Sequence, residues 1–244
     1  MSWVEIALLL AGGCFAGVVN AIAGGGSTLT VPLLIVLADV DGKPANGSNR
    51  VGILTSNITS LLSYRNEGVK VTRNLWPILG PAAIGAPLGA FVIDQFTNDQ
   101  FERFFGLLMI PLIVLTILKP KPNTDADPWP IAVTMLVFFS IGVYGGAIQA
   151  GVGLMLLAAL SRSGLDLVSA NLIKVLFTLM VTCIALPVFI LQGNVRWGPA
   201  FVLAIGLSVG GWIGPKWAVK GGDQWIRYVM IVSAIALAIR LIVG

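Results

Sequence analysis

The chain has 244 residues, of which 57% are hydrophobic and only 11% are charged. Soluble domains carry roughly a quarter charged residues, so this composition excludes a soluble protein and predicts a polytopic membrane protein with crossings of about 20 residues each. The formal net charge of +4 is dispersed and indicates no nucleic-acid partner, and the absence of histidine removes the commonest metal ligand.

The apolar segments form two groups of four, separated by a polar linker. The first group occupies residues 3–37, 46–64, 75–93 and 100–118. The second group occupies residues 129–160, 167–191, 197–217 and 224–243. We therefore divide the chain into a first transmembrane repeat (residues 1–118), a linker (residues 119–128) and a second transmembrane repeat (residues 129–244).

Three consecutive glycines, at residues 24–26, interrupt the first apolar segment. Without side chains, the backbone leaves the helical region there at little cost. Ser27 and Thr28 follow and are residue types that cap helix N-termini, while Pro32 lies in the first turns, where a missing N–H does least harm. We expect a helix, a break and a second short helix that begins near Ser27.

A break of this kind has two interpretations. A helix N-terminus presents free N–H groups and partial positive charge, so it can receive an anion. Broken helices at membrane depth also point to the binding sites of secondary transporters. The simpler alternative is a kink that lets neighbouring helices pack closely through glycine.

The two halves match in sequence at nearly one offset, which indicates an internal duplication. DQFERF at residues 99–104 corresponds to DQWIRY at residues 223–228, and Arg50 corresponds to Lys174. The glycine motif recurs in degenerate form at residues 142–153. We therefore expect the second half to break as the first does, and the two breaks to meet near the membrane midplane.

Lysine and arginine accumulate on the cytoplasmic side, so their distribution tests the topology. With Lys174 left aside, they divide seven against seven if each broken segment crosses the membrane once. They divide nine against five if each broken segment returns as a hairpin. The count favours hairpins, which leaves three further helices in each repeat, makes the repeats inverted and places both chain ends outside the cytoplasm.

The motif from Asn20 to Ser27 with Pro32, its echo at residues 142–153 and the four-plus-four layout resemble the TauE/SafE sulfite-exporter family over the whole chain. The resemblance implies an inner-membrane permease of the bacterial type for a sulfur-containing anion, such as sulfite, thiosulfate or an organosulfonate. The second copy has Gln149 and Ala150 where the first has glycines, so a shared site would be chemically asymmetric.

The candidate substrate-binding residues lie beside the two breaks or are basic residues at corresponding positions in the next segment of each repeat. They are Asn20, Gly24, Gly25, Gly26, Ser27, Thr28, Arg50, Gln149, Gly151, Gly153 and Lys174. A lysine at a helix centre costs roughly 2.5–3.5 kcal/mol on insertion scales, so we expect Lys174 to face a water-filled cavity. The alternative, for Lys174 and for Arg50, is snorkelling to the membrane surface.

The other polar residues of these segments have competing roles. Asn20 and Gln149 either donate to the substrate or bond backbone carbonyls that the breaks set free. Ser27 and Thr28 are first helix caps and second oxyanion donors. Three further amides are interpreted as helix-packing groups rather than ligands: Asn49, Asn57 and Asn171.

The acidic residues fall at segment ends or in loops, which argues against a carboxylate proton relay, a metal enzyme or acid–base catalysis inside the membrane. We therefore predict an all-α secondary permease that is not an enzyme and uses no cofactor. Its expected partners are a small anion and the lipid bilayer, and association into a homo-oligomer is left open. The rival functions are a channel-like anion pore and a non-transport scaffold subunit.

Overall fold

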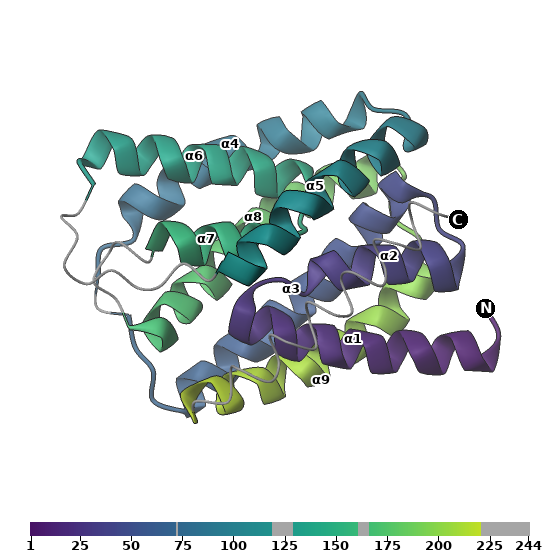
Figure 1. Cartoon of the computed structure of the whole chain (residues 1–244), viewed down its shortest axis with the longest axis horizontal. Coiled ribbons are helices and arrows are strands. Elements are labelled where there is room, and N and C mark those ends of the chain that lie inside the picture. The colour runs from purple at the N-terminus through teal and green to yellow at the C-terminus, as the bar shows by residue number, and fades with distance from the viewer. Residues whose placement is uncertain (72, 119–128, 161–165, 221–244) are drawn as a thin grey trace.

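The computed structural model describes residues 1–71, 73–118, 129–160 and 166–220 (Figure 1). Their helices are α1 (Trp3–Ala23), α2 (Ser27–Ala38), α3 (Gly42–Asn66), α4 (Trp76–Asp94), α5 (Asn98–Leu118), α6 (Ile131–Ala147), α7 (Val152–Leu160), α8 (Leu167–Leu191) and α9 (Trp197–Val219). Four of these helices are long and apolar enough to cross a membrane: α1, α4, α8 and α9. The all-helical membrane architecture is thus confirmed, while the linker at residues 119–128 and the expected segment at residues 224–243 lie outside the described residues.

Both breaks occur where the sequence predicts them. Gly24 ends α1 with φ 77°, and α2 begins at Ser27. In the second half, α6 ends at Ala147 and α7 begins at Val152, after Gly151 with φ 75°. L-residues with a Cβ rarely adopt this left-handed backbone, so glycine lets the chain turn at both positions. Gly24 ends α1, whereas α6 ends earlier, before the extended residue Ile148, and Gly151 turns the chain into α7.

Each broken segment folds as a hairpin. A Cβ on Gly26 would lie 2.6 Å from Asn20 Cβ and would overlap the Ala16 carbonyl oxygen, so α2 begins directly against α1. In Figure 1 the α1–α2 hairpin opens to the right and the α6–α7 hairpin opens to the left. With 12 and 9 residues, α2 and α7 extend about 18 and 14 Å, well short of the ~30 Å hydrocarbon core.

Glycine contacts and hydroxyl groups show that α1, α3 and α9 run in one direction. The carbonyls of Leu10, Cys14 and Val18 on α1 lie in order against Gly206, Gly210 and Gly214 of α9. The hydroxyls of Thr55, Thr59 and Ser63 on α3 donate in order to the carbonyls of Ala204, Ser208 and Trp212 on α9. Since α1 and α3 are parallel, the chain must return between them, which a single crossing by the first broken segment does not allow.

The helices α4, α6 and α8 run in the opposite direction. The end of α4 lies at the start of α3, where Lys43 Nζ donates to the carbonyls of Asp94 and Phe96 at 2.8 and 2.7 Å. The end of α8 reaches the same region, because Asn194 contacts Gly47 and donates from Nδ2 to Asp94 Oδ1 at 3.4 Å.

The remaining helix, α6, lies parallel to α4, with the Phe139 and Val143 carbonyls against Gly85 and Gly89 in order. Three pairs of helices therefore run in opposite directions: α1 and α6, α3 and α8, and α4 and α9. The first helix of each half packs on a helix of the other half, because glycine lets their backbones approach closely.

Candidate functional site

The two breaks touch through their backbones. A Cβ on Gly24 would lie 2.5 Å from both the Cα and the carbonyl carbon of Gly153, and a Cβ on Gly153 would overlap Gly24 in turn. The two breaks therefore meet, as the sequence comparison predicts, while their position near the membrane midplane stays a prediction. The end of α1 and the start of α7 are thereby joined inside the protein, with no side chain between these two glycines.

Lys174 extends from α8 to the end of α1. Its Nζ donates to the carbonyl oxygens of Asn20 and Ala21 at 2.6 and 2.9 Å and to Asn171 Oδ1 at 2.8 Å. An ammonium group has three protons, so all of its donors are engaged. The cation therefore lies against the last carbonyls of α1, where the helix dipole places partial negative charge.

Arg50 makes the corresponding contact in the other half. From α3 its Nη1 donates to the Gly145 carbonyl at 3.1 Å and to Gln149 Oε1 at 3.0 Å, while Nη2 donates to the Gly146 carbonyl at 2.6 Å. The guanidinium also stacks 4.4 Å from the ring centroid of Phe189. Each half thus supplies the cation that neutralises the C-terminal end of the other half's broken helix.

The snorkelling alternative is wrong for both cations. Arg50 is 0% exposed and Lys174 is 1% exposed, so neither side chain reaches the membrane surface. Both residues lie within the helix bundle, where backbone carbonyls accept from their charged groups. The expectation that Lys174 faces a water-filled cavity is also wrong, because its side chain is buried and its three protons bond protein oxygens. The contacts of Gln149 match neither role considered for it, because its amide oxygen accepts from two side chains, Arg50 and, at 3.4 Å, Thr182.

The expectation that Ser27 or Thr28 caps α2 through its side chain is wrong. Gly26 is the residue before the first helical one, and it already has a helical backbone with φ −56° and ψ −38°. Helix formation thus starts one residue earlier than the side-chain oxygens suggest. The Thr28 hydroxyl instead donates back to the Gly25 carbonyl at 2.6 Å. Asn20, Ser27, Thr28 and the glycines of both breaks are all buried.

The sequence interpretation missed two further groups at the helix ends. Asn46 Nδ2 donates to the Ala147 carbonyl at 2.8 Å, and the Tyr64 hydroxyl donates to the Ala21 carbonyl at 3.2 Å. Both lie on the face of α3 that carries Arg50, since residues four and fourteen positions apart share a face of a helix. The sequence does contain a signal for both residues, because their helical spacing from Arg50 places them on the same face of α3.

Several buried donors on α3 and α8, the helices that hold these helix ends, have no hydrogen-bond partner among the described residues. They are Asn49 Nδ2, Arg50 Nε, Asn57 Nδ2 and Asn171 Nδ2, and two amide oxygens of α3, Asn46 Oδ1 and Asn57 Oδ1, are without a partner as well. The buried polar side chains of the described ranges include no Asp or Glu. The region therefore offers N–H groups without a carboxylate counter-charge, which suits an anion.

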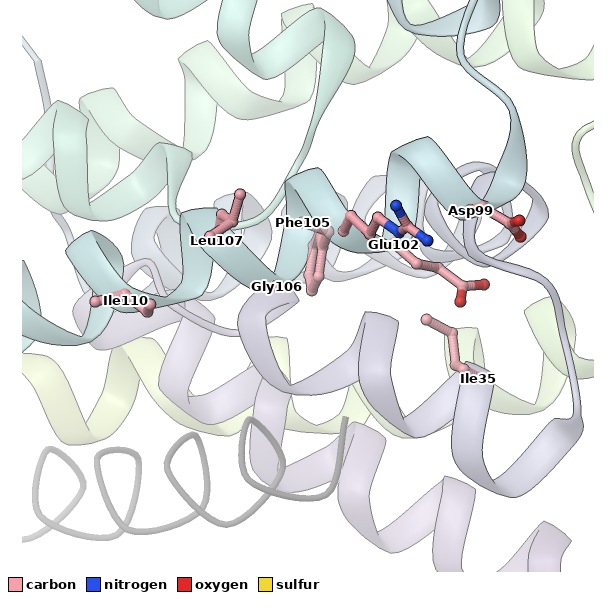
Figure 2. Close-up of a pocket in the computed structure, with 8 residues that line it drawn as sticks. Ile35, Asp99, Glu102, Phe105, Gly106, Leu107 and Ile110 are labelled. Carbon is pink, nitrogen blue, oxygen red and sulfur yellow. The ribbon is translucent and has the colours of Figure 1, made fainter. Parts of the chain in front are cut away.

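A pocket of about 620 Å³ lies elsewhere, between α2 and α5, and Figure 2 shows its lining. Apolar residues, among them Leu107 and Ile110, form one end, and Asp99 and Glu102 lie toward the other. None of its lining residues belongs to the candidate site, so this pocket is separate from the junction of the breaks.

Comparison with known proteins gives one family for the whole chain. The model of the family described as "Sulfite exporter TauE/SafE" matches residues 9–241. A probable membrane transporter protein, ORF9 of a Sinorhizobium species, is 26% identical over 97% of this chain and 92% of its own length. YunE of Bacillus subtilis, another probable membrane transporter protein, is 25% identical over 99% of this chain and 98% of its length.

A further probable membrane transporter protein, from Haemophilus influenzae, is 23% identical over 97% of this chain and 94% of its own length. No solved structure matches the chain significantly. The family model covers nearly all of the residues that form the two hairpins and the helices around them. The chain is therefore a multi-pass membrane protein that belongs to the TauE/SafE sulfite exporter family of transporters.

Proposed function

We propose that the chain moves a small sulfur-containing anion across the cytoplasmic membrane and binds it beside the junction of the two breaks. The observation that carries the proposal is the group of buried N–H donors on α3 and α8 that have no acceptor in the part of the chain that the structure describes. A buried donor left unpaired costs about 1–3 kcal/mol, and an oxyanion supplies several acceptor oxygens. The family description, which names sulfite, supports sulfur as the central atom.

Electrostatics support the same position. The helices α2 and α7 begin at the breaks, and their N-termini carry partial positive charge. The C-termini of α1 and α6 would repel an anion, but Lys174 and Arg50 neutralise them. In this proposal the breaks supply backbone donors, Asn20 and Gln149 flank them, and the two cations act mainly by charge. Direct contact by Lys174 would require one of its present hydrogen bonds to open.

The test is uptake by liposomes that contain the purified chain, screened with sulfite, thiosulfate, sulfoacetate, taurine and sulfate. We expect saturable uptake of at least one sulfur oxyanion above the level of empty liposomes. Uptake that does not saturate and does not discriminate among anions would identify a channel-like pore. If none of the compounds enters, the chain is a non-transport subunit and the proposal fails.

We also propose that the two halves are inverted repeats, with the linker at residues 119–128 between them. The opposite directions of corresponding helices support this, as does the grouping of basic residues. Arg65 and Lys216 lie at the end of the bundle where Ser63 meets Trp212, and Lys43 lies at the opposite end of α3. By the positive-inside rule the end with Arg65 faces the cytoplasm.

Single cysteines at positions 65 and 216 should therefore react with a membrane-impermeant maleimide only from the cytoplasmic face in intact and everted vesicles. A cysteine at position 43 should react only from the other face. The two cysteines on one face act as mutual controls for reagent access. Labelling of positions 43 and 216 from the same face would refute the inverted arrangement.

A further inference from the structure

Asn57 lies on α3 midway between the side chains that hold the two broken helices. Arg50 reaches the end of α6, and Tyr64 reaches the end of α1. Positions 50, 57 and 64 are spaced two helical turns apart, so they share one face of α3 and Asn57 is about 10 Å along the axis from each neighbour. Its side chain is 0% exposed.

Both polar atoms of the Asn57 side chain, Oδ1 and Nδ2, have no hydrogen-bond partner within residues 1–71, 73–118, 129–160 and 166–220. The hydroxyls on the α9 side of α3 differ, since Thr55, Thr59 and Ser60 all donate to α9 carbonyls. An amide that packs helices would make such a bond across the interface. Asn57 makes no such bond to any described residue, so no hydrogen bond seen here supports the helix-packing role suggested by its sequence position.

The paired donor and acceptor of this amide restrict the ligand that fits it. A fully ionised oxyanion would satisfy Nδ2 but would face Oδ1 with a second negative oxygen. An oxyanion that keeps one hydroxyl satisfies both atoms, because its O⁻ accepts from Nδ2 while its O–H donates to Oδ1. No buried Asp or Glu among the described residues competes for that proton.

We propose that Asn57 contacts the transported anion at the centre of its path, and that the anion crosses as a singly protonated oxyanion, as hydrogensulfite is. This inference rests on the proposed function. The proton then travels on the substrate itself and no protein carboxylate is needed to relay it. Asn57 selects anions with both an ionised and a protonated oxygen over anions that lack the hydroxyl.

Variants of Asn57 test the contact in liposomes and in detergent. Asn57→Leu should lower kcat/KM for sulfite uptake at least tenfold while leaving the melting temperature equal or higher, because it removes unsatisfied polar atoms. Asn57→Ser, which keeps a donor and an acceptor, should retain more uptake than Asn57→Leu. The matched control is Ser60→Ala, one turn away, which loses a bond to Gly211 and should lower the melting temperature with unchanged KM.

Other results would overturn the inference. Wild-type kinetics in Asn57→Leu, or lost uptake accompanied by a lower melting temperature, would make Asn57 a structural residue. If the wild type takes up no sulfur anion, the proposed function fails and this inference with it. That failure is distinct from an active wild type in which Asn57→Leu changes nothing.

The pH dependence of uptake tests whether the anion crosses in its singly protonated form. At constant total sulfite, the initial uptake rate of the wild type should fall as the pH rises through the range in which hydrogensulfite ionises to sulfite. Methanesulfonate, which has no hydroxyl in the same pH range, should be a poor substrate and a poor competitor. Equal uptake of methanesulfonate and sulfite, or a rate that follows the fully ionised form, would refute the protonated species.

Discussion

Gly24→Ala should lower sulfite uptake about tenfold or more and reduce the free energy of unfolding by about 2–5 kcal/mol. The added Cβ would meet the Gly153 backbone at 2.5 Å, and it would sit on a residue with φ 77°. A left-handed backbone costs an L-residue roughly 1–2 kcal/mol, and overpacking costs typically 1–3 kcal/mol. Uptake by reconstituted vesicles and thermal unfolding in detergent measure the two effects.

Two matched glycines separate these causes. Gly68 has almost the same backbone, with φ 75°, but a Cβ there meets nothing within 4 Å, so Gly68→Ala carries the backbone cost alone. Gly153 lies inside α7, and a Cβ added there would overlap Gly24, so Gly153→Ala carries the clash alone. If Gly24→Ala is no more harmful than Gly68→Ala, close contact of the breaks has no functional role.

Lys174→Gln should raise the half-saturation concentration for substrate at least tenfold, which corresponds to a loss of about 1.4 kcal/mol of binding free energy. The substitution keeps an amide donor but removes the charge that neutralises the end of α1. It should also lower the melting temperature, because at least one of the three acceptors around Nζ is left without a donor. Uptake kinetics and thermal unfolding provide the measurements.

Lys174→Arg is expected to be as damaging as Lys174→Gln, although it keeps the charge. Three acceptors lie 2.6–2.9 Å from one nitrogen, and a planar guanidinium cannot place its protons around a single point. The control is Lys70→Gln, which neutralises an exposed cation after α3 and should change little. Unchanged half-saturation and melting temperature in Lys174→Gln would mean that the cap on α1 is dispensable.

Local features of the chain were predictable because they depend on neighbouring residues alone. The glycines at residues 24–26 permit the turn, so the start of α2 at Ser27 follows from backbone freedom and hydropathy. The bounds of α8 coincide with the predicted segment at residues 167–191, since an apolar run ends where polar residues begin. The smaller error at Gly26 arises because glycine also tolerates the helical conformation, which moved the cap by one residue.

The partners of the buried polar groups were decided only by the tertiary structure. The sequence singled out Arg50 and Lys174 as corresponding cations, but their acceptors are backbone carbonyls of the other half, and for Lys174 and Asn20 these lie 154 residues apart. Every residue has a carbonyl, so no side-chain pattern marks the ones a broken helix leaves free. The unpaired amide of Asn57 is likewise visible only after folding, because a missing partner is a property of the surroundings and not of the residue.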